Sequence, residues 1–178
     1  TTADYRSDEI ERKISISASL MTIDWKKNKF NILDMPGYPD FIGEVHCGLR
    51  VTDLTVVLLN GVSGVEVGTD LAWDIIEKNK GPRLFFVNRL DKEHASFSKV
   101  VANAQEAYGN SAIPVQFPVK EGETFDAVVD LLTMKKVTFQ SDGSGKYKSE
   151  EIPADLKGKA EEMRNALIEK IAEADDTI

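Results

Sequence analysis

Two short apolar runs constrain the fold of this chain more than any other feature. Residues 54–59 (LTVVLL) and 83–87 (RLFFV) are apolar at nearly every position, which is typical of parallel strands covered on both faces. Between them, apolar residues from Leu71 to Ile76 recur at helical spacing, and a second such helix follows Ser96, a residue suited to an N-cap. The alternation predicts an α/β fold with a doubly wound, mostly parallel sheet.

The flanking segments predict a hairpin on one side and a smaller subdomain on the other. Residues 20–25 and 29–33 are expected to form two strands joined by a short polar turn, followed by a helix that begins after Pro39. After about residue 110 the pattern changes to shorter strands, a turn and a long amphipathic final helix. We therefore expect two domains, residues 1–110 and residues 111–178.

Composition and charge exclude several classes of protein. The chain has 178 residues, is 42% hydrophobic, and has no apolar run near the roughly 20 residues that span a bilayer. Its net charge of -8 argues against a direct nucleic-acid-binding face. Cys47 is the only cysteine, so no internal disulfide can form, and a cytoplasmic setting fits. The start at Thr1, without Met, suggests a fragment of a longer protein.

Polar side chains stand where two of the predicted strands end. Asp34 closes the strand before Pro36 and Gly37, and Asn88 directly follows residues 83–87. Ligands of open α/β sheets bind beyond the carboxyl ends of the strands, so Asp34, Asn88 and the nearby Asp91 are expected to share one edge. A lone Asn-x-x-Asp is often only a helix cap, but the two motifs in this order favour a nucleotide site.

The chemistry of these residues predicts a guanine nucleotide with a divalent cation. Asp34 is expected to hold Mg²⁺ through water, and Gly37 lets the backbone donate its N–H to a terminal phosphate. Asp91 can accept hydrogen bonds from the N1–H and the exocyclic amine of guanine. Adenine would leave that carboxylate unpaired, which disfavours it strongly.

The motifs resemble those of translational GTPases. "DMPGYPDF" (34–41) is similar to the D-x-P-G-H-x-D-F signature of that family, "NRLD" (88–91) to N-K-x-D, and "ERKISIS" (11–17) to the E-R-G-I-T-I segment of the first switch loop. "IPVQFPV", "VVDLL" and "EEIPADL" resemble elongation factor G in order and spacing, including the subdomain inserted in its GTP-binding domain. The resemblance covers nearly the whole chain.

The resemblance implies a site and a set of partners. Tyr38 and Gly37 occupy the catalytic positions, and Ser15 and Asp34 the magnesium positions. The nucleotide positions are Asp34, Pro36, Gly37, Tyr38, Asn88, Arg89 and Asp91. The implied cofactors are GTP or GDP and Mg²⁺, and the implied partner is the ribosome with its large-subunit stalk. We expect a monomer that does not contact membranes.

Three departures from the family pattern bear on activity. Ser15 replaces a threonine and keeps the metal-binding hydroxyl, and Arg89 replaces a lysine whose stem lies against the base. Tyr38 replaces the histidine that positions the attacking water. Losing one stabilising group of this kind typically slows a reaction by on the order of 10²- to 10³-fold. We therefore expect slower or differently triggered hydrolysis, and Tyr38→His to raise ribosome-stimulated turnover.

A phosphate-binding G-x-x-x-x-G-K-[ST] loop is absent from the sequence. "GSGK" (143–146) lies in a turn with no strand-to-helix transition around it, so it does not replace that loop. The isolated chain is therefore expected to bind guanine nucleotide weakly and to be inactive. Two functions remain open: a ribosome-associated GTPase that drives translocation or recycling, and a GTP-binding ribosome regulator with weakened catalysis.

Overall fold

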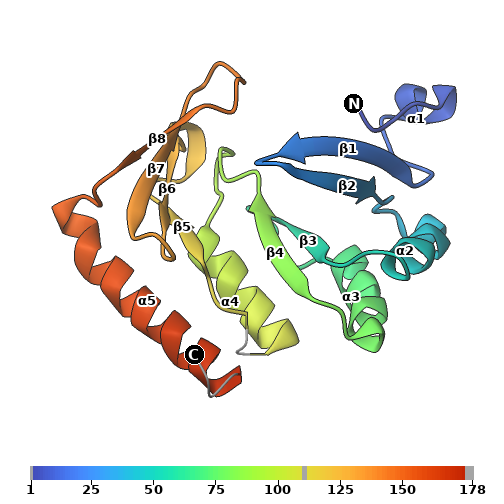
Figure 1. Cartoon of the computed structure of the whole chain (residues 1–178). Helices are drawn as coiled ribbons and strands as arrows, with labels where there is room; N and C mark the ends of the chain where they lie inside the picture. Colours follow the sequence, from blue (N-terminus) through green and yellow to red (C-terminus); the bar gives the residue numbers. More distant parts are fainter. Residues whose placement is uncertain (1, 110–111, 175–178) are drawn as a thin grey trace. The chain divides into compact units, whose positions relative to one another are not determined.

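The computed structural model describes residues 2–109 and 112–174, apart from the side chain of Ala174, as an α/β chain (Figure 1). It contains two compact units, Thr1–Val57 with Glu66–Phe86, and Leu58–Val65 with Val87–Ile178. The division runs through strands β3 (Thr55–Asn60) and β4 (Arg83–Asn88). The predicted domain boundary after residue 110 falls inside the second unit and stays a prediction.

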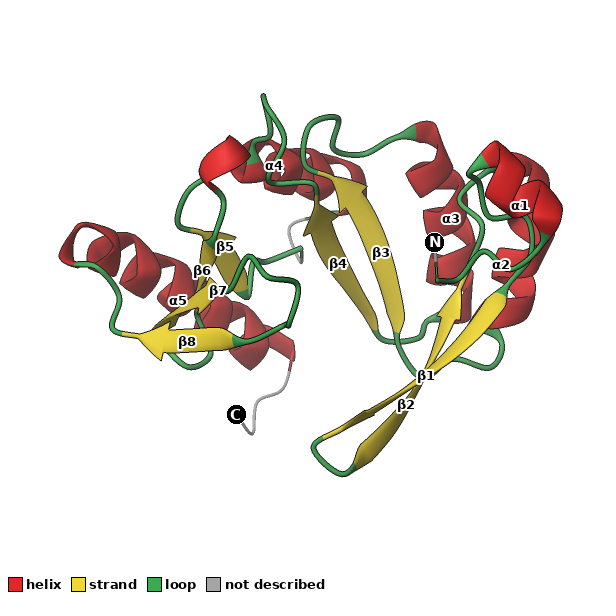
Figure 2. Ribbon diagram, turned by 90° about the horizontal axis from the view of Figure 1, so that it is seen from above, coloured by secondary structure: helices red, strands yellow, loops and turns green. Residues whose placement is uncertain are grey.

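The first unit begins with a short helix and the predicted hairpin. Helix α1 (Ser7–Arg12) precedes strands β1 (Ser19–Trp25) and β2 (Asn28–Asp34). The strands pair antiparallel from Ser19 opposite Asp34 to Trp25 opposite Asn28, and Figure 2 shows them as a long twisted ribbon. The turn residues Lys26 and Lys27 both have positive φ (47° and 67°), as a two-residue hairpin turn requires. The hairpin prediction is confirmed.

Helices cover part of the first unit. The turn η1 (Pro39–Phe41) leads into α2 (Ile42–Leu49), and α3 (Val67–Asn79) follows β3. Gly48 of α2 is buried against Met35, where any Cβ would overlap the methionine side chain. The ring of Trp73 in α3 stacks on Phe85 of β4, with centroids 5.2 Å apart. These contacts attach α2 to the segment after β2, and α3 to β4.

Strands β3 and β4 form a two-stranded parallel sheet. Thr55 N donates to Pro82 O (3.0 Å) and Gly61 N donates to Asn88 O (2.7 Å), so both strands run in the same direction. The predicted parallel arrangement of residues 54–59 and 83–87 is confirmed for this pair of strands. The wider doubly wound sheet, however, is not visible among the described residues, where the hairpin forms a separate sheet.

The prediction that these two strands are covered on both faces is wrong for the described chain. Val57 and Leu59 are buried, but Val56 and Leu58 between them are 50% and 60% exposed, and Phe86 is 52% exposed. Side chains of a strand alternate between two faces, so one face of this sheet is covered and the other is open.

The second unit contains a helix and an antiparallel layer. Helix α4 (Phe97–Tyr108) precedes strands β5 (Gln116–Pro118), β6 (Ala127–Asp130), β7 (Lys135–Phe139) and β8 (Tyr147–Glu150), with the turn η2 (Gly122–Thr124) before β6. The strands pair in this order, and α5 (Ala154–Ala174) packs along the sheet (Figure 1). Its core consists of Phe117, Val129, Leu131, Ile152, Ala160 and Leu167. The predicted short strands and long final helix are confirmed.

No helix in the described part of the chain combines the length and the apolar character needed to cross a membrane.

Candidate functional site

Asp34, at the end of β2, lies near a second carboxylate. Its side chain is half-buried, and burial raises the pKa of the Asp34 carboxyl, with a further increase from the negative charge of Asp4. Asp4 Oδ1 accepts a hydrogen bond from Ser15 Oγ at 2.8 Å. Ser15 is therefore hydrogen-bonded to Asp4, and the negative charge of Asp4 acts on Asp34. The sequence patterns contain no signal for Asp4, which stands in no regular element.

The segment that carries Ser15 is held by a buried carboxylate. Glu9 of α1 is 1% exposed and accepts hydrogen bonds from Ile16 N (2.9 Å) and Ser17 N (3.0 Å). These two N–H groups hold the pKa of the Glu9 carboxyl below its usual range. Glu44 of α2 accepts a further bond from Ala18 N at 2.8 Å. One carboxylate from α1 and one from α2 thus fix the backbone that follows Ser15.

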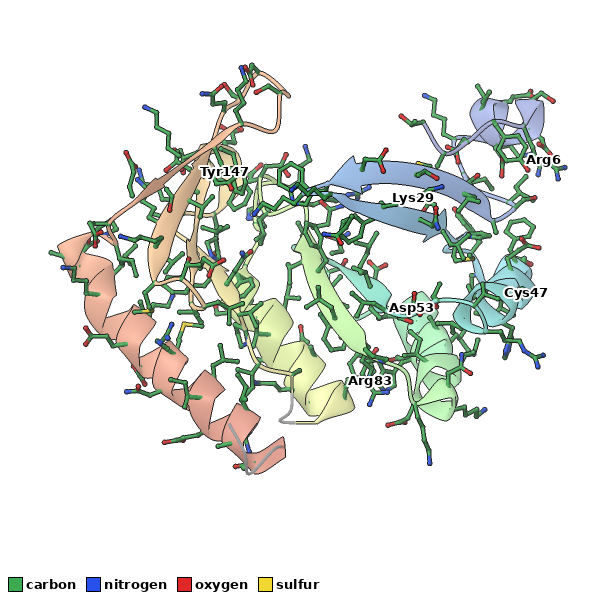
Figure 3. The ribbon with its side chains drawn as sticks, viewed as in Figure 1. Arg6, Lys29, Cys47, Asp53, Arg83 and Tyr147 are labelled. Atoms are coloured by element: carbon green, nitrogen blue, oxygen red, sulfur yellow. The ribbon has the colours of Figure 1, made fainter. Side chains whose placement is uncertain are left out.

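Helix α1 itself is stabilised at its start. Arg6 N donates to Glu9 Oε2 at 3.1 Å, and the Arg6 guanidinium forms an ion pair with Asp8 at 2.9 Å. Figure 3 shows Arg6 beside α1 in the first unit. The sequence signal for this arrangement is Glu9, which stands three residues after the N-cap residue Arg6. A glutamate at this spacing is typical of helix starts.

The Pro-Gly-Tyr segment follows Asp34 directly. Pro36 is buried, whereas Gly37 and Tyr38 are exposed, Tyr38 to 53%. Tyr38 O accepts a hydrogen bond from Phe41 N (3.0 Å), which begins η1. A Cβ at Gly37 would meet no atom within 4 Å, and the φ of this residue lies outside the left-handed region. The described residues therefore give no steric reason for glycine at this position.

The Asn-Arg-Leu-Asp loop leaves β4 in the second unit. Asn88 Oδ1 accepts a hydrogen bond from Arg89 N (2.8 Å), and Arg89 has a positive φ of 61°. Leu90 is buried, while Asp91 is exposed and pairs with Lys92 at 3.1 Å. Lys92 lowers the pKa of Asp91 by hydrogen bonding. Exposed ion pairs are weak because water screens them, so another donor can displace Lys92 from Asp91.

The loop is attached to the chain after β3. Gly61 N donates to Asn88 O, and Gly61 O accepts from Ser96 N at 2.9 Å. A Cβ at Gly61 would lie 2.8 Å from Asn88 O, so this close approach requires glycine. Ser96 occupies the N-cap position as predicted, but its side chain makes no capping hydrogen bond. Its hydroxyl instead lies 3.3 Å from that of Ser98.

The predicted site residues thus form two groups. In the first unit, Asp4 binds the Ser15 hydroxyl and acts by its charge on Asp34, and Pro36, Gly37 and Tyr38 follow Asp34 closely in the chain. The residues Asn88, Arg89 and Asp91 share one loop in the second unit. The structure describes the groups separately, and their convergence on one ligand stays a prediction.

A cavity of about 310 Å³ lies elsewhere, in the first unit. Thr55 and Pro82, at the amino ends of β3 and β4, line it together with Leu49, Arg50 and Asn79. None of the predicted site residues lines this cavity, so it does not contribute to the candidate site.

The fold and these motifs together define a domain of the nucleotide-binding α/β class. The model of the family described as "Elongation factor Tu GTP binding domain" matches residues 1–175, and the chain belongs to that family. Among solved structures, the crystal structure of a Thermus thermophilus protein designated ttk003000868 matches with 26% sequence identity and a TM-score of 0.89. The match covers 99% of this chain and 26% of that protein. The predicted resemblance to a translational GTPase G domain is confirmed.

Proposed function

We propose that this chain is part of an elongation factor G-like GTPase, which binds and hydrolyses GTP on the ribosome to drive translocation or recycling. The observation that carries the proposal is the half-buried Asp34 at the end of β2, which is exposed to the negative charge of Asp4, the carboxylate that accepts a hydrogen bond from the Ser15 hydroxyl. Two carboxylates that repel each other are stabilised by a cation between or beside them. The family membership makes a nucleotide-bound Mg²⁺ the natural occupant.

The residues present fit a magnesium ion that is bound only partly by the protein, rather than a metal held entirely by protein side chains. Magnesium is usually bound by one or two carboxylates, with water and substrate phosphates completing its shell. Asp34 and Ser15 supply one carboxylate and one hydroxyl, and Asp4 already accepts a hydrogen bond from that hydroxyl. Within the described residues, no three His, Cys, Asp or Glu side chains gather to hold a metal by themselves. The phosphates of GTP would supply the remaining ligands.

The phosphate and the base have separate binding residues in this proposal. Gly37 has open space around it, so a phosphate can approach its backbone N–H closely. Pro36 and Tyr38 flank that approach. On the base side, Asp91 accepts from guanine N1–H and the exocyclic amine, Arg89 lies along the base, and Asn88 shapes the loop. Both groups would contact the same nucleotide.

Resemblance supports the more specific parts of the proposal. The loop from the end of β4 to α4, residues 88–96, contains the Asn-Arg-Leu-Asp motif and is called the base loop. The β5–β8 layer with α5 follows this loop in the order found in factor G, which favours that branch of the family. By the same resemblance, this layer would contact the large-subunit stalk, and the protein would act as a cytoplasmic monomer. The chain alone, without a phosphate-binding loop, would be inactive.

A second function is favoured by one residue. Tyr38 carries a neutral phenol where the family pattern has an imidazole that can become a cation. A protein with this substitution can bind GTP and still hydrolyse it slowly. The alternative is therefore a GTP-binding ribosome regulator with weakened catalysis.

Steady-state GTP hydrolysis by the full-length protein, with and without ribosomes, tests both functions. We expect ribosome-stimulated turnover in the wild type and an increase on the order of 10²-fold in Tyr38→His. Trp25→His is the control, because Trp25 is an exposed aromatic residue at the turn end of β1, outside both groups of site residues. An unchanged or lower rate in Tyr38→His would count against the role of Tyr38. GTP binding without any stimulated turnover would favour the regulator.

A further inference from the structure

We propose that the Glu121–Gly122 turn is a positioning element for guanine recognition, an inference that rests on the proposed function. The turn follows β5 in the second unit, about thirty residues after the Asn-Arg-Leu-Asp loop. None of the family motifs includes it. Its contacts, however, reach both the base loop and the helix that follows that loop.

The first contact caps a helix. Phe97 N, the first N–H of α4, donates to Glu121 Oε1 at 2.7 Å. The first N–H groups of a helix have no partner within it, and a carboxylate placed there also interacts favourably with the helix dipole. Ser96 makes no such bond with its side chain. Glu121 therefore supplies the side-chain acceptor at the start of α4, which directly follows the base loop.

The second contact is made to the loop itself. Gly122 N donates to Leu90 O at 2.8 Å, one residue before Asp91. Gly122 has a φ of 76°, a conformation that favours glycine, so the direction of this N–H depends on the residue type. The turn is itself fixed by Phe125 N, which donates to Gly122 O at 2.9 Å.

The base loop is consequently held from two sides. Gly61 binds the backbone at Asn88 and at Ser96, and the 121–122 turn binds it at Leu90 and at Phe97. Arg89 and His94 within the loop have positive φ values of 61° and 65°, which cost energy for residues other than glycine. A loop with two such residues keeps its shape only if its surroundings hold it. Releasing the 121–122 contacts should therefore misplace the Asp91 carboxylate.

The test compares GDP with inosine diphosphate, using the full-length protein and direct binding measurements. Inosine diphosphate lacks the exocyclic amine of guanine and can give Asp91 one hydrogen bond instead of two. The wild type is expected to prefer GDP by about tenfold. In Glu121→Ala this preference should fall by roughly threefold or more. Glu123→Ala, which removes an exposed carboxylate two residues away, should retain the wild-type preference.

The ratio of the GDP and inosine diphosphate affinities separates a positioning role from a general loss of stability, because a loss of stability would weaken the binding of both nucleotides equally. An unchanged GDP preference in a folded Glu121→Ala protein would overturn the inference while leaving the proposed function intact. A wild type with no GDP preference would overturn the proposed function and the inference with it. If Glu121→Ala does not fold, Glu121→Gln keeps an acceptor and loses only the charge. It should lower the preference by about twofold, and an unchanged value would again overturn the inference.

Discussion

The β3–β4 sheet and the β5–β8 layer differ sharply in how they bury apolar side chains. Val129 of β6, Leu131 directly after it and Ala160 of α5, the helix that covers the sheet, are each 0% exposed. In the β3–β4 sheet, Leu58 is 60% exposed and Phe86 is 52% exposed. The β1–β2 hairpin is similarly open. The comparison shows that the β5–β8 layer closes its own core, whereas the strands that carry the proposed site leave apolar faces that other protein surface normally covers.

The largest effect is expected in the closed layer. Leu131→Ala should reduce the free energy of unfolding by about 2–5 kcal/mol, because it leaves a cavity among side chains that are already fully buried. Urea unfolding of the 178-residue chain measures the change. A cost below about 1 kcal/mol would mean that this layer is packed no better than the open sheets.

A smaller effect is expected at Glu9, which holds the Ser15 segment in the first unit. Its pKa is lowered by the N–H groups of Ile16 and Ser17, so its stabilising contribution is present above its ordinary pKa and is lost as pH falls through the lower folded value. Thermal melts between about pH 7 and pH 3 should show a smaller loss of stability in Glu9→Gln than in wild type. Glu11→Gln, at an exposed position of α1, is the control. Parallel curves for Glu9→Gln and wild type would contradict this account.

Asp34 is expected to contribute to the pH dependence of stability with the opposite sign to Glu9. Its pKa is raised by burial and by Asp4, so the folded state holds the proton more strongly and loses stability as pH rises from the ordinary value through the raised one. Asp34→Asn should therefore raise the melting temperature of the metal-free chain slightly at about pH 7. Asp24→Asn, on the exposed part of the hairpin, should leave it unchanged. A lower melting temperature for Asp34→Asn would show that its charge is already compensated.

The smallest effect is expected on the open sheet. Leu58→Ala should change the free energy of unfolding by no more than about 0.5 kcal/mol, because the leucine is exposed in the described chain. The same urea titration used for Leu131→Ala provides the measurement. A cost similar to that of Leu131→Ala would remove the difference between the two regions.

Local patterns in the sequence predicted the elements well. The hairpin, the strands beginning near residues 54 and 83, and the long final helix occur close to their predicted bounds. These features depend on side-chain periodicity and on turn residues that are neighbours in sequence. The motifs around Asp34 and Asn88 were equally local, so the candidate site could be proposed from them.

Contacts between distant segments could not be predicted in the same way. Glu9 binds N–H groups seven and eight residues away, and Glu121 caps α4 from 24 residues away. Neither bond leaves a periodic signal, since an exposed and a buried glutamate look alike in one sequence. The open face of β3 was also missed, because an apolar run indicates that burial is favourable and does not show which residues provide it.

Nucleotide selectivity of the full-length protein tests the central claim, which is that Asp91 recognises guanine. Xanthine carries a carbonyl where guanine carries its amine, so an asparagine amide can donate to it where aspartate cannot. The wild type should prefer GTP over xanthosine triphosphate by on the order of 10³-fold, and Asp91→Asn should reverse that preference. Equal binding of both nucleotides by the wild type, or an unchanged preference for GTP in Asp91→Asn, would contradict the account.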